Sequence, residues 1–300
     1  MYRQRRATAE GDVMPSKIEW TNETWNPTTG CTKVSPGCAH CYAESLTKRY
    51  AGAPGWPAEF KPWTPGNAAE NVVLHPDRLD APLRWKTPRM VFVDSMSDLF
   101  HENIPDDYID KVFAVMALTP QHTYQVLTKR PERMREYMHI EAQAGLRVEE
   151  LLDQRWAEKN DKPIRLSPMQ TEAWPLPNVW LGVTVENQHW ADVRIPILLD
   201  TPAAVRFVSA EPLLGPVDLE HYLHASWGPN EDERLDWVIV GGESGPKHRL
   251  FNPEWARSIV MQCSEGWYDV ACFVKQLGGL RPGNKLEDLP PDLRVREFPR

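Results

Sequence analysis

The chain has 300 residues, of which 41 % are hydrophobic, and it carries a formal net charge of −8 at pH 7. With a mean hydropathy of −0.52, this composition argues against non-specific coating of nucleic acid and against a membrane protein, because no apolar run approaches the roughly 20 residues of a spanning helix. Five cysteines are an odd number, which does not suit the disulfide framework of a secreted protein. We therefore expect a cytoplasmic protein with reduced thiols and no membrane partner.

Residues 1–15 are predicted to form a disordered basic tail. Arg3, Arg5 and Arg6 give this segment its charge, but no apolar stretch follows them, so it does not have the pattern of a secretory signal. Met14 is expected to be an alternative translation start.

Three cysteines lie close together near the start of the chain, where Cys31, Cys38 and Cys41 form a C-x6-C-x2-C pattern. Three thiolates on one loop suit a metal centre that keeps a ligand from outside the protein. A structural zinc site normally takes four protein ligands, whereas an iron–sulfur cluster held by three cysteines leaves one iron open. The alternative is a zinc-binding loop in which His40 or Cys263 is the fourth ligand.

Six short apolar runs end abruptly in small, charged or hydroxyl-bearing residues. They cover residues 90–93, 124–127, 179–183, 205–208, 237–240 and 272–274. Near-continuous apolar runs of about four residues are typical of strands covered on both faces, as in parallel sheets. Amphipathic helices are predicted between some of these strands, at 107–117 and 253–263, and the spacing favours serial βα units.

Serial βα units predict an α/β fold, namely a partial or full TIM-like (βα) barrel over residues 16–282. The active site of such a barrel is built from the carboxyl ends of its strands. An open doubly wound sheet is the alternative, but no strand is followed by a nucleotide-binding glycine motif. Residues 141–176 interrupt the regular spacing of the βα units and are predicted to be an inserted helical segment, with a helix at 141–159. Residues 283–300 are predicted to form a C-terminal strap over the barrel.

With this cysteine loop and these strand ends, the chain resembles the radical S-adenosylmethionine (SAM) enzymes. In that superfamily a C-x3-C-x2-C loop after the first strand binds a 4Fe-4S cluster, and an aromatic residue often precedes the third cysteine. Here the first gap has six residues, and His40 precedes the third cysteine. The resemblance implies that Cys31, Cys38 and Cys41 ligate three irons of a 4Fe-4S cluster and that SAM binds the fourth.

A closer resemblance covers nearly the whole chain from residue 16 onward. The matching blocks are SKIEWT at 16–21, WNP at 25–27, GC at 30–31, SPGC at 35–38, DSMSDLF at 94–100, LTKRP at 127–131, LGVTVE at 181–186, SAEP at 209–212, GGESG at 241–245 and VKQ at 274–276. Together they are similar to the phage "gene product 37/68" family, whose members carry a three-Cys motif and have no known function. One departure is Cys272, where relatives are expected to carry proline.

The superfamily resemblance implies that polar residues at the strand ends bind SAM. Candidates for its ribose hydroxyls and amino group are Ser95, Ser97, Asp98, Thr184, Glu186, Asn187, Glu211 and Glu243. Candidates for its carboxylate or for an anionic substrate are Lys129, Arg130 and Lys275. Each polar candidate can instead cap a helix or occupy a turn. The three cations can instead balance the charges of Glu186, Glu211 and Glu243.

The predicted function is a radical SAM-type enzyme that cleaves SAM and starts radical chemistry, with a reductase or a flavodoxin- or ferredoxin-type protein as electron donor. Relatives in phages suggest a nucleic acid, a modified base or a nucleotide as substrate. The alternative is a non-catalytic zinc- or Fe-S-binding protein with a structural, redox-sensing or interaction role. Metal content separates the two, because iron with sulfide supports the enzyme and stoichiometric zinc alone supports a zinc-binding protein.

Overall fold

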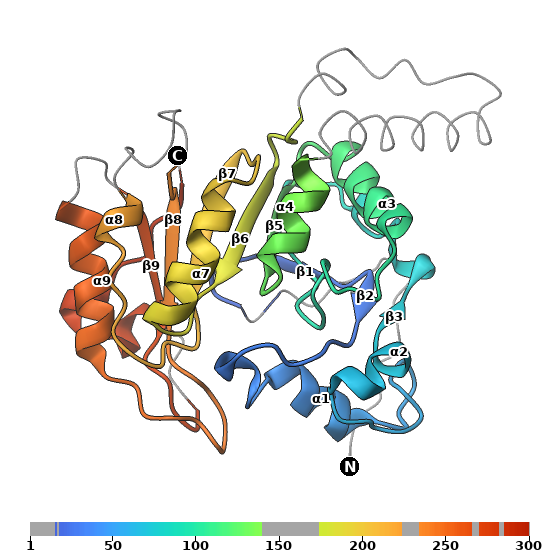
Figure 1. Cartoon of the computed structure of the whole chain (residues 1–300), viewed down its shortest axis with the longest axis horizontal. Helices are drawn as coiled ribbons and strands as arrows, with labels where there is room; N and C mark the ends of the chain where they lie inside the picture. Colours follow the sequence, from blue (N-terminus) through green and yellow to red (C-terminus); the bar gives the residue numbers. More distant parts are fainter. Residues whose placement is uncertain are drawn as a thin grey trace.

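The computed structural model describes residues 16, 18–139, 174–223, 234–265, 270–281 and 285–299. Its centre is a seven-stranded parallel sheet (Figure 1). In their order across the sheet, the strands are β1 (Glu23–Trp25), β4 (Met90–Val93), β5 (Thr123–Thr128), β6 (Val179–Thr184), β7 (Val205–Ala210), β8 (Trp237–Gly241) and β9 (Ala271–Gln276). A small antiparallel sheet pairs β2 (Thr28–Thr29) with β3 (Val73–Leu74).

Neighbouring strands of the large sheet follow one another along the chain. A doubly wound sheet reverses its strand order at a switch point, and this sheet does not, so the doubly wound alternative is wrong. The sheet curls into a half-barrel with β1 and β9 at its two edges (Figure 1). The α/β fold expected from the sequence is therefore confirmed, in the form of a half-barrel of parallel strands.

Helices cover the convex face of the sheet. Figure 1 shows α3, α4, α7 and α9 along this face, whereas α1 lies below the carboxyl ends of the strands. Right-handed crossovers between successive strands place their helices on one side of a curled sheet. The helices are α1 (Tyr42–Tyr50), α2 (Ala68–Asn71), α3 (Asp106–Ala117), α4 (Pro131–His139), α7 (Gln188–Leu199), α8 (Glu220–Leu223) and α9 (Pro253–Glu265), with 3-10 helices at Pro36–Cys38, Pro65–Asn67, Pro76–Arg78, Pro82–Arg84, Leu286–Asp288 and Pro291–Leu293.

Each strand divides its side chains between two cores. On β4, Val91 and Val93 join the main core under the helices, and Phe92 joins a second core on the concave side, as alternation along a strand requires. The second core also contains Phe207 and the side chains of Trp20, Trp237, Ile239 and Phe273. A Cβ atom on Gly182 would lie 2.6 Å from the ring of Phe207, so this glycine makes room for an aromatic ring inside the half-barrel.

All six predicted strands are present, most of them extended by one to three residues, and both predicted inter-strand helices form. The sequence reading missed β1, which is a three-residue strand. The predicted tail at 1–15 lies outside the described residues, as do most of the predicted insertion at 141–176 and all of its predicted helix at 141–159. Within the described parts of the chain, no helix combines the length and the apolar character needed to cross a membrane.

The described part of the predicted strap, residues 285–299, packs against the body of the protein. Leu289 and Leu293 are buried in the main core. Farther along, the backbone N–H of Val274 donates to the carbonyl of Val295 at 2.9 Å. These contacts tie the segment to the edge strand β9.

Candidate functional site at the carboxyl end of the sheet

The cysteine loop, residues 30–41, connects β2 to α1 and passes across the carboxyl end of the half-barrel (Figure 1). Its first residue is fixed by sterics. Gly30 has φ +86°, and a Cβ atom there would lie 1.7 Å from the backbone oxygen of Asn71, so only glycine fits. The N–H of Gly30 donates to the carbonyl of Met96 at 2.9 Å, which attaches the start of the loop to the chain that leaves β4.

Arg130, just after β5, connects the first cysteine to two carboxylates. Its Nη1 lies 3.1 Å from Asp98 Oδ2 and 3.5 Å from the Sγ atom of Cys31. Its Nε donates to Glu102 Oε2 at 2.9 Å, and its Nη2 donates to Thr32 Oγ1 at 2.8 Å. Arg130 was predicted to balance glutamates at other strand ends or to bind an anion, but in the structure its carboxylate partners are Asp98 and Glu102.

Asp98 is buried beneath this arginine. Its carboxylate accepts hydrogen bonds from Thr128 Oγ1 at 2.7 Å and from the backbone N–H groups of Lys129 and Phe100 at 3.0 and 3.1 Å. Burial opposes ionisation of Asp98, but the charge of Arg130 and these donors outweigh it and lower its pKa. Asp98 therefore joins the ends of β4 and β5 as an ionised, fully engaged carboxylate.

Glu186, which follows β6, supports the middle of the cysteine loop. The side chain is fully buried, and it accepts hydrogen bonds from Ser35 Oγ at 2.5 Å and from Arg194 Nη1 at 3.2 Å. Gly37 packs directly on this carboxylate, since a Cβ atom there would lie 2.4 Å from Oε1. Both carboxylate oxygens of Glu186 are thus occupied in holding the loop to β6.

Glu243, which follows β8, supports the far part of the loop. Arg249 donates to its two oxygens from Nη2 at 2.7 Å and from Nε at 3.0 Å, and His40 Nδ1 lies 3.1 Å from Oε2. Burial opposes ionisation of Glu243, but the hydrogen bonds from Arg249 and His40 outweigh it and lower the pKa to about 2. Arg249 also donates from Nη2 to the carbonyl of Pro36 at 3.1 Å.

Glu211 and Lys275 form an ion pair at the ends of β7 and β9. Lys275 Nζ lies 3.2 Å from Glu211 Oε1, so the charge-balance interpretation holds for this lysine. Ser209 Oγ donates to Glu211 Oε2 at 3.5 Å. A Cβ atom on Gly241 would lie 2.2 Å from Glu211 Oε1, so the glycine at the end of β8 provides the space for this carboxylate.

Ser95 and Ser97 both contact the segment that precedes the cysteine loop. Ser95 Oγ donates to Asn26 Oδ1 at 3.1 Å, and its carbonyl accepts a hydrogen bond from the hydroxyl of Tyr42. Ser97 Oγ donates to the carbonyl of Thr28 at 3.2 Å. Tyr42, the residue after the third cysteine, is 50 % exposed, so an aromatic residue is accessible at this side of the loop.

Asp94, at the end of β4, clamps the same segment. It is buried with φ +57°, and Thr28 donates to it from its backbone N–H at 3.1 Å and from Oγ1 at 2.9 Å. Burial raises the pKa of Asp94 to about 7, with a smaller contribution from Asp98. Asp94 stands in the DSMSD block, but the sequence reading did not single it out, because its partner is 66 residues away.

Thr184 and Asn187 lie at the end of β6. Asn187 is the N-cap of α7, because its Oδ1 accepts from the backbone N–H of Trp190 at 3.2 Å, so the capping interpretation is confirmed for this residue. Thr184 is buried, and its carbonyl accepts from Arg194 Nη1 at 2.6 Å.

Lys129 differs from the other predicted cations. Its ammonium has no hydrogen bond or ion pair to any residue in the described ranges, although its backbone N–H binds Asp98. The charge of Lys129 acts on Cys41, where it opposes the rise in thiol pKa that burial causes. A cation is therefore available beside the cysteine loop for a ligand.

The family-model comparison matches residues 15–290, a span that includes every residue of this site, to a family described as "Protein of unknown function (DUF5131)". The chain belongs to this family. Neither the curated proteins nor the solved structures contain a match to it.

The thiols of the loop are partly exposed and reduced. Burial raises the pKa of Cys31 to about 12, with a further contribution from Asp98, while Arg130 opposes the rise. Within the described ranges, no three His, Cys, Asp or Glu side chains form a group that holds a metal ion as they stand. The zinc alternative needs His40 or Cys263 as its fourth ligand. Both are engaged elsewhere, since His40 pairs with Glu243 and Cys263 is buried in the core beside Cys272.

The donor set fits an iron–sulfur cluster in its chemistry. Thiolates are the ligands that such clusters take, and cations close to a cysteine favour its thiolate form. Arg194 is 1 % exposed, and its Nε and Nη2 have no hydrogen-bond acceptor among the described residues, although its guanidinium lies 4.1 Å from the ring of Trp190. Cys38 is close enough to act on the charge of Arg194, so the loop runs between two buried arginines.

Arg194 and Arg249 were missed by the sequence reading. Arg194 lies inside α7 among apolar residues, and a charge at such a position is a signal of a buried partner. Arg249 follows the glycine-rich block after β8, but its bond to Pro36 spans 213 residues, and no local pattern indicates it.

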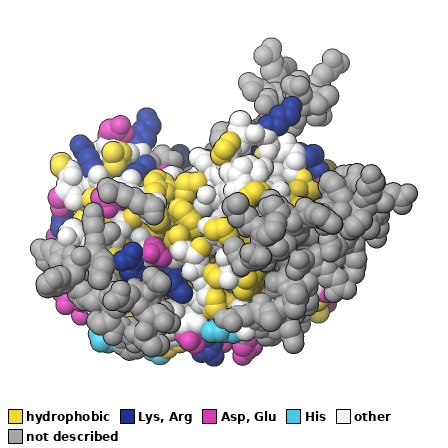
Figure 2. Space-filling model, turned by 90° about the horizontal axis from the view of Figure 1, so that it is seen from above, with side chains coloured by type: hydrophobic (Ala, Val, Ile, Leu, Met, Phe, Trp, Pro, Cys, Tyr) yellow, Lys and Arg dark blue, Asp and Glu magenta, His cyan; other side chains and the backbone are white. Residues whose placement is uncertain are grey.

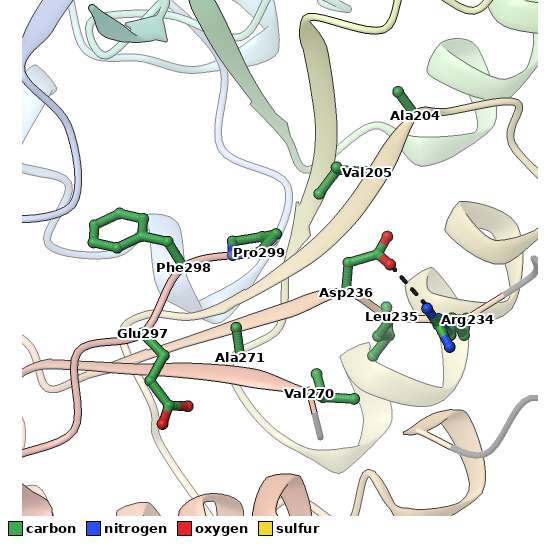
Figure 3. A pocket seen from close by; sticks show the side chains of 10 residues that line it. All are labelled: Ala204, Val205, Arg234, Leu235, Asp236, Val270, Ala271, Glu297, Phe298 and Pro299. Carbon is green, nitrogen blue, oxygen red and sulfur yellow. Dashed lines mark ion pairs between the residues drawn. The ribbon is translucent and has the colours of Figure 1, made fainter. Parts of the chain in front are cut away.

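The opposite, amino end of the half-barrel carries a cavity. A cavity of about 520 Å³ lies at the starts of β7 and β9 and before β8 (Figure 3). Figure 2 looks onto this end and shows a group of hydrophobic side chains near its centre. Its lining residues are Ala204, Val205, Arg234, Leu235, Asp236, Val270, Ala271, Glu297, Phe298 and Pro299. None of the predicted site residues belongs to this lining.

Proposed function

We propose that this protein is a radical SAM-type enzyme that binds a 4Fe-4S cluster through Cys31, Cys38 and Cys41 and binds SAM at the neighbouring strand ends. The observation that supports this most is the attachment of one three-cysteine loop to the ends of β4, β5, β6 and β8. Barrel enzymes carry their active sites at this end of the strands.

When bound, the cluster and SAM would supply radical chemistry, in which one electron cleaves the sulfonium and the radical formed takes a hydrogen atom from the substrate. The protein contributes position and electrostatics. Glu186 and Glu243 hold the loop from two sides, and their own charges are met by Arg194 and Arg249. These paired groups leave the loop held without unbalanced negative charge beside the thiolates.

The Glu211–Lys275 pair is the best candidate site for the amino-acid end of SAM. Its two side chains are 14 % and 23 % exposed, and they present one charge of each sign at the carboxyl end of the sheet. A zwitterion carries the complementary pair of charges, so it can replace the internal ion pair without leaving a charge unpaired. Glu186, Asp98 and Glu243 are less suited, because protein donors already engage their oxygens.

Lys129 supports an anionic substrate, such as a nucleotide, a modified base in a nucleic acid or another phosphate-bearing molecule. A lysine ammonium without a partner is a point charge suited to phosphate. The chemistry also requires an electron from outside, so we propose a reductase or a flavodoxin- or ferredoxin-type protein as partner.

The test is anaerobic reconstitution with iron and sulfide, followed by EPR of the reduced protein with and without SAM. We expect a 4Fe-4S signal that shifts when SAM is added and is lost in Cys38→Ala, while the Cys272→Ala control retains it. A cluster whose signal ignores SAM would replace the proposal with an electron-transfer or redox-sensing role. Stoichiometric zinc without a cluster would support the non-catalytic zinc protein.

A salt titration of oligonucleotide binding tests the substrate class. Contacts to phosphates weaken as salt rises, so we expect affinity to fall with salt and to fall further in Lys129→Met. Affinity that does not depend on salt would count against a polymeric nucleic acid and leave the nucleotide.

A further inference from the structure

Arg130 is hydrogen-bonded to the sulfur of a candidate cluster ligand, because its Nη1 lies 3.5 Å from Cys31 Sγ. The guanidinium is nearly buried, with 10 % of the side chain exposed. A charged donor held against sulfur in a partly buried site acts on that sulfur more strongly than it would in water.

The guanidinium is fixed from all sides. Its Nε is held by Glu102 and its Nη2 by Thr32 Oγ1, and Nη1 is shared between Asp98 and Cys31. Thr32 Oγ1 lies 3.0 Å from Nε2 of the buried His101, so the threonine is held in turn. The planar fork therefore keeps its N–H bond directed at Cys31.

We propose that Arg130 is a positioning residue that orients Cys31 as a ligand and raises the reduction potential of the cluster bound there. This inference rests on the proposed function. Hydrogen bonds to ligand sulfurs and charge near a cluster are among the factors that set its potential. A positive charge favours the reduced state, which carries one more negative charge than the oxidised state.

Asp98 makes the effect of removing Arg130 larger. Its carboxylate shares Nη1 with Cys31 and acts on the thiol in the opposite sense to the arginine. Without Arg130, this buried negative charge faces Cys31 with no cation between them, so both the loss of the cation and the uncovered anion lower the potential.

The experiment is an anaerobic redox titration of the reconstituted protein, followed by EPR. We expect the midpoint potential of the cluster to be lower in Arg130→Gln by at least about 59 mV, which corresponds to a tenfold change in the one-electron equilibrium constant. Arg130→Lys keeps the charge but cannot reach four partners with a planar fork, so we expect an intermediate shift.

Arg133→Gln is the matched control. This arginine lies in α4, the helix that begins directly after Arg130, but it bonds the carbonyls of His101 and Ile104 and the carboxylate of Asp106. We expect the cluster in Arg133→Gln to have the same midpoint potential as the cluster in the unmodified protein.

The outcomes separate the inference from the function on which it rests. Failure of the unmodified protein to take up a cluster overturns the proposed function. A cluster that forms, with the same potential in Arg130→Gln as in the unmodified protein, overturns the role of Arg130 alone. If Arg130→Gln does not fold, Arg130→Lys decides, and an unshifted potential there overturns the role.

Discussion

The two ends of the half-barrel are built from the same strands but differ in what fills them. At the carboxyl end, carboxylates from β6 and β8 pair with arginines and hold a cysteine loop. At the amino end, a cavity of about 520 Å³ opens among mostly apolar residues (Figure 3). The same framework therefore supports an ordered polar network at one end and an open space at the other, and the candidate chemistry lies with the network.

Cysteine substitution should give the largest contrast. We expect Cys31→Ser or Cys41→Ser to abolish iron incorporation during reconstitution, because each removes one of three ligands. Cys263→Ala and Cys272→Ala should retain full iron and lose stability instead, since both side chains are buried in the helix–sheet core. Iron per chain and urea unfolding measure the two effects, and equal iron loss in all four variants would remove the distinction.

Glu186→Ala tests the carboxyl-end network itself. It leaves Arg194 as an unpaired charge with 1 % exposure, and breaking a buried pair from one side costs about 3–5 kcal/mol of unfolding free energy. The control at the amino end is Glu297→Ala. The exposed carboxylate of Glu297 accepts a hydrogen bond from the backbone N–H of Cys272 at 3.1 Å, so we expect its removal to lower the unfolding free energy by about 1 kcal/mol. Urea unfolding compares them, and similar losses would contradict the contrast.

Asp94 should make stability depend on pH. Its pKa is raised by burial to about 7 in the folded protein, above the value of about 4 in an unfolded chain, so the unfolded state ionises first. Stability is then full below about pH 4 and falls as pH rises to about 7, by at most about 4 kcal/mol.

Asp94→Asn removes this contribution. Asparagine tolerates the positive φ at this position and can still accept from the N–H of Thr28. We would measure the unfolding free energy of the unmodified protein and of the variant from pH 4 to 8. The difference between them should change steadily as pH rises from 4 and become constant near pH 7. A constant difference would show that Asp94 does not titrate in this range.

Phe298→Ala should have the smallest effect. The ring lies 5.3 Å from Trp237 and 5.5 Å from Phe273 at the rim of the amino-end cavity, but it is 39 % exposed. We expect a loss of about 1 kcal/mol and no change in iron content or potential. A loss of iron in this variant would mean that the two ends are coupled.

The sequence predicted the strands well because their signal is local. A run such as 237–240 is apolar on both faces, and that pattern alone indicates a buried parallel strand. The three-residue strand β1 was not predicted, because it is too short to show a hydrophobic pattern. The serial spacing of these runs predicted a partial or full barrel, and the described residues form a half-barrel with β1 and β9 at its edges.

The site was predicted in position but not in its pairings. Polar residues after each strand do gather at one end, yet the sequence could not show that Arg249 pairs with Glu243 and reaches Pro36. Such pairings depend on side-chain geometry between distant segments. The roles in binding SAM and a cluster remain predictions for this reason.

The attachment of the cysteine loop to Arg249 has a consequence for synthesis of the protein. Pro36 and Arg249 are 213 residues apart, so at about 5–20 residues per second the loop leaves the ribosome roughly 10–40 seconds before its last anchor. During that interval three thiols stand on a loop without its full set of supports. The protein would therefore need a reducing environment, or early metal delivery, most urgently while it is still being made.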